Sequence, residues 1–117
     1  MVLVGHGSKA PGFDSAMRKV ASSLRRGGRY RDVRCAFLEV SRPSIPEAVR
    51  LCVRRGARQV RVLPYFVLTG KHVTRDIPRI VAETARTHRG RSRVVLRPYL
   101  GYHEKIVSVV RERIGRV

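Results

Sequence analysis

The sequence predicts an α/β domain in which short parallel strands alternate with longer helices. Short β-branched runs and amphipathic stretches follow one another in the order βαβαβαβα. The connections between them are short, which favours a parallel sheet with helices on both faces. With 117 residues the chain can build one hydrophobic core but not two. We therefore expect one domain over residues 1–117, with a four-stranded sheet in flavodoxin-like order.

The first two elements are a short strand and an amphipathic helix. Val2–Val4 is an apolar run of strand length. Pro11–Leu24 is predicted to be a helix because its apolar residues recur at spacings of three and four. Gly27 marks its end. The apolar stripe of this helix consists of Phe13, Met17, Val20, Ala21 and Leu24.

The middle of the chain repeats this alternation with a clear helix start. Val33–Leu38 is predicted to be the second strand. Ser44 and Glu47 have the spacing of a capping box, so a helix begins after Ser44 and ends at Gly56. The third strand is predicted at Gln59–Leu63, where small apolar residues alternate with polar ones.

The last third begins with a segment that has no regular period, Tyr65–Arg75. A helix is then predicted from the N-cap Asp76 to Thr87. Arg91–Arg97 is predicted to be the fourth strand, and Gly101–Ile114 the last helix.

The charge of the chain is strongly positive. Lys and Arg together number 26 against 8 Asp and Glu, and 22 of the 26 are arginines. A formal charge of +18 attracts polyanions such as nucleic acid, an anionic membrane or a polycarboxylate. Biased composition, or adaptation to heat or salt, explains the arginines equally well. The charge by itself therefore names no partner.

We expect a soluble protein of the cytoplasm. No apolar run approaches the ~18–20 residues of a membrane span, and Met1–Val4 is too short for a signal-peptide core. Cys35 and Cys52 have no partner at metal-binding spacing, and a cytoplasmic disulfide would be unusual. We interpret both cysteines as small buried thiols.

Three potential metal ligands follow three different strands. His6 follows the first strand, Glu39 the second, and His72 lies in the loop after the third. Ligands of open parallel sheets bind beyond the carboxyl ends of the strands. If the strand order is 2-1-3-4, these side chains meet at one edge. Two imidazoles and a carboxylate suit a first-row divalent metal with open coordination positions.

Each of these residues also has an ordinary interpretation. A histidine beside a glycine is usually a turn residue, and Glu39 alone would be an exposed carboxylate. We interpret His88 and His103 as surface or packing residues. No phosphate loop, nucleophile elbow or dinucleotide fingerprint is present. Nucleic acid is not favoured either, because aromatic residues are few and the arginines are scattered along the chain.

Four motifs together resemble the class II chelatases, specifically the small sirohydrochlorin cobaltochelatases of the short CbiX type. The resemblance covers nearly the whole chain, and its third motif is long and specific. The matching segments are Val2–Ser8, Ala36–Ile45, Val62–Val73 with Asp76–Pro78, and Pro98–Gly101.

The resemblance implies a metal chelatase, a lyase, that inserts Co²⁺, or Fe²⁺ or Ni²⁺, into sirohydrochlorin on the way to cobalamin or a related tetrapyrrole. His6 and His72 match the family's metal-binding histidines, and His6 also matches its proton acceptor. Glu39 matches a carboxylate near the metal in some members. No tightly bound cofactor is implied, because the metal is a substrate. The positions that match tetrapyrrole contacts are Arg42, Val67, Leu68, Thr69, Gly70, Lys71 and His72.

The chemistry of the residues agrees with this function, and two other functions stay open. Metal insertion needs a base and a weakly held metal, and neutral imidazole serves both needs. Since a tetrapyrrole is large beside so small a domain, we expect a homodimer that encloses it. The alternatives are a basic module that binds nucleic acid or another anion, and a nonenzymatic carrier of tetrapyrrole or metal.

Overall fold

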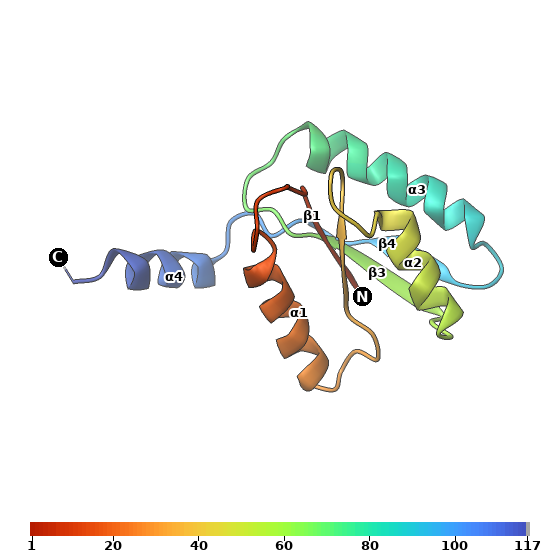
Figure 1. The fold of residues 1–117 in the computed structure, drawn as a ribbon, viewed down its shortest axis with the longest axis horizontal. Helices are drawn as coiled ribbons and strands as arrows, with labels where there is room; N and C mark the ends of the chain where they lie inside the picture. The colour runs from red at the N-terminus through yellow and green to blue at the C-terminus, as the bar shows by residue number, and fades with distance from the viewer. Residues whose placement is uncertain (117) are drawn as a thin grey trace.

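The computed structural model describes residues 1–116 and confirms the predicted α/β alternation (Figure 1). All strands are parallel, in the order β2-β1-β3-β4, so the expected flavodoxin-like order is confirmed. β1 therefore lies between β2 and β3. The elements are β1 Val2–Gly5, α1 Ser15–Arg26, β2 Arg34–Phe37, α2 Ile45–Arg54, β3 Gln59–Pro64, η1 His72–Asp76, α3 Ile77–Thr87, β4 Arg93–Leu96 and α4 Glu104–Ile114.

The larger part of the core lies between the sheet and the pair α2 and α3. Alternate residues of the strands point to this face, as the two-residue period of a strand requires. The capping box predicted at Ser44 and Glu47 is present and fixes the start of α2. The fully or almost fully buried members are Val2, Val4, Ala36, Ile45, Ala48, Val49, Cys52, Val60, Val62, Ile77 and Val81.

The opposite face of the sheet is covered by α1. Met17 and Ala21 of this helix pack against Leu3, Cys35 and Phe37 of β1 and β2. Both cysteines are free and buried, as predicted. Burial raises the pKa of both thiols, so they stay protonated and unreactive at neutral pH.

The last helix, α4, departs from the arrangement expected of a doubly wound domain. It extends away from the body of the molecule, and none of its residues is buried (Figure 1). The radius of gyration is therefore 15.0 Å, and the longest dimension is 55 Å. A compact domain of this length would have a radius of about 13–14 Å. Among the described residues, no helix is both long and apolar enough to cross a membrane.

The start of α3 differs from the prediction. Asp76 was expected to cap the helix, but its side chain makes no capping hydrogen bond. Instead, the π-helical turn η1 runs directly into α3, and Asp76 has helical dihedral angles. The carboxylate of Asp76 is therefore available for another partner.

Candidate metal centre

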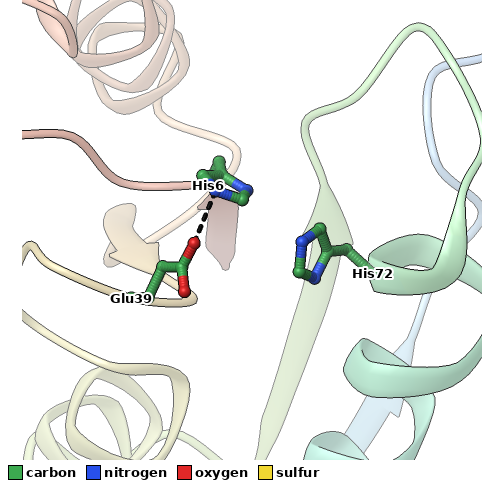
Figure 2. Close-up of side chains that lie close together, drawn as sticks. All are labelled: His6, Glu39 and His72. Atoms are coloured by element: carbon green, nitrogen blue, oxygen red, sulfur yellow. Dashed lines mark ion pairs between the residues drawn. The ribbon is translucent and has the colours of Figure 1, made fainter.

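Three loops at the carboxyl edge of the sheet bring His6, Glu39 and His72 together (Figure 2). Their potential ligand atoms all lie within 4.8 Å of one another. His6 follows β1, Glu39 follows β2, and His72 begins η1 after β3. Because β1 is the middle strand of the three, its neighbours deliver the other two ligands from either side. The structure thus brings together all three residues predicted from the sequence.

The geometry is open and suits a weakly held divalent metal. His6 Nε2 lies 2.7 Å from Glu39 Oε1, and the two imidazole rings are 4.8 Å apart at an interplanar angle of 70°. All three side chains are about half exposed. Metal bonds to such ligands are about 2.0–2.2 Å long, so small side-chain rotations would close this set around one ion. Three protein ligands on one side leave positions open for a second ligand.

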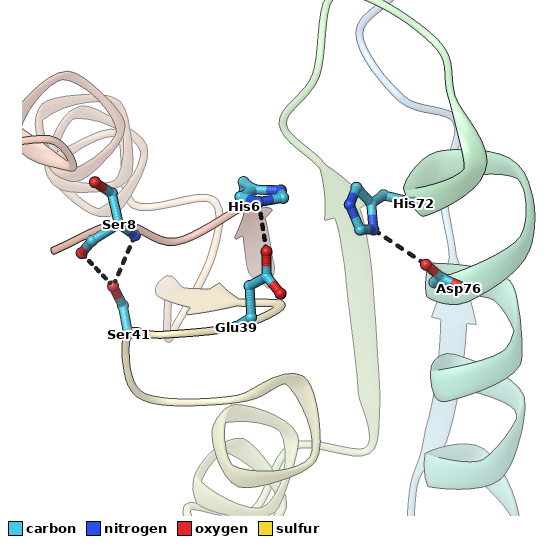
Figure 3. Close-up of polar contacts among 6 residues, drawn as sticks. All are labelled: His6, Ser8, Glu39, Ser41, His72 and Asp76. Carbon is cyan, nitrogen blue, oxygen red and sulfur yellow. Dashed lines mark hydrogen bonds and ion pairs between the residues drawn. The ribbon is translucent and has the colours of Figure 1, made fainter.

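Hydrogen bonds between the loops after β1 and β2 hold His6 beside Glu39. The carbonyl oxygen of His6 accepts from the backbone N–H groups of Leu38 and Glu39, each at 3.1 Å. Two residues further along, the Ser41 hydroxyl accepts from Ser8 N–H and donates to Ser8 C=O (Figure 3). The backbone rather than side-chain packing therefore sets the distance between the first two ligands.

The close approach of these loops depends on Gly7 and on a strained turn at Val40. Gly7 has φ +108°, and a Cβ at this position would collide with the carbonyl oxygen of Glu39. Val40 has φ +68°, and Ser41 N–H donates to Glu39 C=O at 2.7 Å across it. This is the rare γ-turn, which a β-branched residue adopts only under constraint. Strain of this kind is concentrated at functional sites.

Asp76 positions the third ligand, a contact that the sequence analysis missed. The Nδ1 atom of His72 lies 3.0 Å from Asp76 Oδ2, which orients the ring and leaves Nε2 for a metal (Figure 3). A carboxylate behind a metal-binding histidine fixes the tautomer and raises the basicity of the ligand. The sequence signal for this contact is the spacing of four residues between His72 and Asp76. From the sequence, Asp76 was expected only to cap a helix.

The predicted substrate-contacting residues lie on exposed segments that follow Glu39 or precede His72 in the sequence. Leu68 is 80% exposed and Val67 is 50% exposed, and both lie in the segment that precedes His72. Arg42 forms an ion pair with Glu47, which lowers the pKa of that carboxyl to about 2. The remaining loop residues Thr69, Gly70 and Lys71 are exposed. Their contact with a tetrapyrrole stays a prediction.

The two other histidines lie away from this centre, as expected. His88 is 6% exposed and packs at the end of α3. His103 caps α4, with its Nδ1 atom accepting from Lys105 N–H at 3.1 Å.

Fold and site together define an α/β domain with an open candidate metal centre of two histidines and one carboxylate. The family model described as CbiX matches residues 1–117, and the chain belongs to that family.

Named relatives are chelatases of longer chain. The chain is 33% identical over 114 residues to the chloroplastic sirohydrochlorin ferrochelatase of Arabidopsis thaliana, covering 97% of this chain and 50% of that protein. It is 38% identical over 81 residues to the sirohydrochlorin cobaltochelatase of Methanocaldococcus jannaschii, covering 69% of this chain and 57% of that protein. The matches thus span 50% and 57% of the length of these two relatives.

A solved structure shares the whole fold. The sirohydrochlorin chelatase SirB of Bacillus subtilis subspecies spizizenii, in complex with cobalt, matches with a TM-score of 0.85 and 26% identity. The match covers 97% of this chain and 48% of SirB. The chain therefore corresponds to about half of that enzyme.

Proposed function

We propose that this domain inserts a divalent metal, Co²⁺ in the first place, into sirohydrochlorin. The observation that carries the proposal is the convergence of His6, Glu39 and His72 in one open site of a CbiX-family chain. The names of the relatives support the substrate, and the cobalt complex of SirB supports the metal. The reaction would belong to the biosynthesis of cobalamin or a related tetrapyrrole, in the cytoplasm.

The reaction exchanges two pyrrole N–H protons for one M²⁺ ion, so two protons must leave the macrocycle. The two imidazoles and the carboxylate hold the ion through the side facing the protein and leave its other positions to the pyrrole nitrogens. As bonds to the macrocycle form, those to the protein break. Once the ion has left the protein, His6 Nε2 and Glu39 Oε1, 2.7 Å apart, can each accept one of the two protons and pass it to solvent.

The surroundings of the centre suit a flat, anionic macrocycle. The exposed apolar side chains of Val67 and Leu68 offer a surface against which a ring can pack. Arg42 and Lys71 carry positive charges on the same edge for the peripheral carboxylates.

A second copy of the domain would complete the enclosure, so the proposal includes a homodimer. One copy presents its metal centre on an open edge, with all three ligands about half exposed. SirB matches this chain over 48% of its length, which leaves room there for a second such unit. The apolar side of α4 supports the same arrangement, since Val109, Val110 and Ile114 are each about half exposed or more.

The direct test mixes the purified protein with sirohydrochlorin and Co²⁺, Fe²⁺ or Ni²⁺ and follows the absorbance of the macrocycle. His6→Ala and His72→Ala should each abolish most of the insertion while leaving thermal unfolding unchanged, because both side chains are about half exposed and lie outside the core. Glu39→Gln should impair metal binding less than the histidine substitutions do, but should slow turnover. His103→Asn, which retains a cap acceptor on α4, is the matched histidine control.

The outcomes separate the alternatives. Near-normal turnover in either histidine-to-alanine variant would show that the ligand assignment is wrong. Binding of both sirohydrochlorin and metal without any absorbance change on mixing would favour a nonenzymatic carrier.

A further inference from the structure

Arginine side chains gather at the amino-terminal edge of the sheet, opposite the metal centre. Three adjoining hollows of about 770, 680 and 440 Å³ lie there, formed by the segments that precede β2, β3 and β4. Arg58, in the turn before β3, lines all three. Ten of the 22 arginines of the chain line these hollows: Arg29, Arg31, Arg50, Arg54, Arg55, Arg58, Arg61, Arg89, Arg91 and Arg93.

Four of these arginines line the second hollow. Arg50 and Arg54 reach it from α2, Arg58 from the turn after α2, and Arg91 from the loop after α3. Among the described residues, no carboxylate lines the second or third hollow, and Asp32 is the one carboxylate that lines the first. Within residues 1–116, none of these four guanidinium groups takes part in an ion pair. Guanidinium groups this close together repel one another, which lowers the stability of the fold unless an anion neutralises their charge.

Two buried polar groups without partners lie at the same place. Within the described chain, only His88 Nδ1 and Ser92 Oγ are buried side-chain polar atoms that lack a hydrogen-bond partner. His88 is 6% exposed and lines the second hollow, and Ser92 is 8% exposed and lines the third. Unsatisfied buried polar atoms are rare in folded proteins, and a bound water or ion is one of the explanations for them. This observation is independent of the arginines.

We propose that this edge is a binding site for an anion that carries several phosphate groups, centred on Arg58 and Arg91. A guanidinium donates two parallel hydrogen bonds to a phosphate, and the several oxygens of a phosphate accept from more than one arginine at once. A carboxylate has only two oxygens, so it can accept the paired hydrogen bonds of only one guanidinium. The hollows have the volume of sites for small ligands, and their continuity past Arg58 suits a chain of phosphates rather than one ion.

Free polyphosphate anions and a nucleic-acid backbone share this chemistry. Tyr30 is the one aromatic side chain, other than His88, that lines the hollows. Stacking of successive bases is therefore not available, and a nucleic acid would bind through its phosphates without sequence preference.

The site is tested by calorimetric titration of the full chain with tripolyphosphate, and with a mixed-sequence single-stranded RNA of about 12 nucleotides. The double variant Arg58→Gln/Arg91→Gln should weaken tripolyphosphate binding at least about tenfold, since each lost charge-assisted fork is strong. Arg86→Gln/Arg111→Gln removes the same charge from exposed helix positions outside the hollows and should bind as the wild type does. Metal insertion should be unchanged in both, because the metal centre lies at the other edge.

Each outcome decides the proposal. Equal binding by the two double variants would overturn it, because the effect would then be one of net charge. Citrate that binds as tightly as tripolyphosphate would overturn the preference for phosphate. If Arg58→Gln/Arg91→Gln weakens the binding of both tripolyphosphate and RNA, the site stands. The probe that binds the wild type more tightly then identifies the source of the phosphate groups. The proposal would also be overturned if tripolyphosphate did not bind the wild type and RNA still bound tightly to Arg58→Gln/Arg91→Gln.

Discussion

The imidazole of His72 is held by the carboxylate of Asp76, with 3.0 Å between Nδ1 and Oδ2. Both residues belong to the π-helical turn η1, where a spacing of four places them side by side. The pair presents Nε2 of His72 toward His6 and Glu39 (Figure 2). Asp76 is therefore a positioning residue of the proposed metal centre.

Substitution Asp76→Asn should lower the affinity for Co²⁺ about 10- to 100-fold, because the ring loses the group that fixes its tautomer and orientation. Metal titration followed by the absorbance of the bound cobalt measures this effect. Glu83→Gln is the matched control, since it removes a carboxylate that pairs with Arg79 further along α3. Equal cobalt affinity in the two variants would contradict the role of Asp76.

Gly7→Ala should destabilise the protein by about 3 kcal/mol and disrupt the metal centre, because it adds a strained backbone conformation and a collision with Glu39. Chemical denaturation measures the stability. Gly28→Ala is the control: Gly28 also has a positive φ, +73°, but nothing lies within 4 Å of an added Cβ. Its cost should be the conformational strain alone, about 1–2 kcal/mol. Equal losses in the two variants would show that the contact with Glu39 is not tight.

Arg42→Ala should raise KM for sirohydrochlorin more than it lowers kcat, because a grip on a peripheral carboxylate is the same before and during insertion. Steady-state kinetics separate the two constants. A defect in kcat alone would place Arg42 at the reacting centre instead.

The same substitution should also change how stability depends on pH. The hydrogen bond from Arg42 contributes most to the low pKa of Glu47, and the backbone hydrogen bond from Ser44 opposes protonation further. This pKa is held at about 2, against its usual value of 4.5. A lowered carboxyl pKa stabilises the fold fully above pH 4.5, and this contribution is lost as the pH falls toward 2. Wild type and Arg42→Ala should therefore differ in Tm at neutral pH and converge near pH 2. A difference that is independent of pH would show that the pair does not act through Glu47.

Several features of the fold and the site were predictable because they follow from local pattern and from the rule for parallel sheets. The capping box at Ser44 fixed the start of α2, and the alternation of elements fixed the class of the sheet. Once the order places β1 between β2 and β3, the segments that hold His6, Glu39 and His72 lie at the same edge of the sheet.

Other features depend on tertiary structure and have no local signature. The sequence also allows a helix that begins with Asp76 as its cap, in which case His72 would lie before the helix. The two side chains lie side by side because the π-helical turn includes both residues. The arginines are scattered along the chain, and only the fold gathers Arg58 and Arg91 at one edge. That edge is not the one with the metal centre, so these ten arginines lie away from the proposed substrate.

Assembly provides the last prediction, because α4 has an apolar side that the domain does not cover. Val110 and Ile114 are one helical turn apart, and are 49% and 67% exposed. If these side chains pack in the proposed homodimer, Val110→Asp should weaken association at least about tenfold, since a charge would be buried in an apolar contact. Ser108→Asp adds the same charge at another exposed position of α4 and should leave the dimer intact. Sedimentation across a range of protein concentrations measures both, with insertion activity recorded on the same samples. A wild-type protein that is strictly monomeric and fully active would contradict the shared enclosure, whereas a dimer that both variants retain would place the interface elsewhere than on α4.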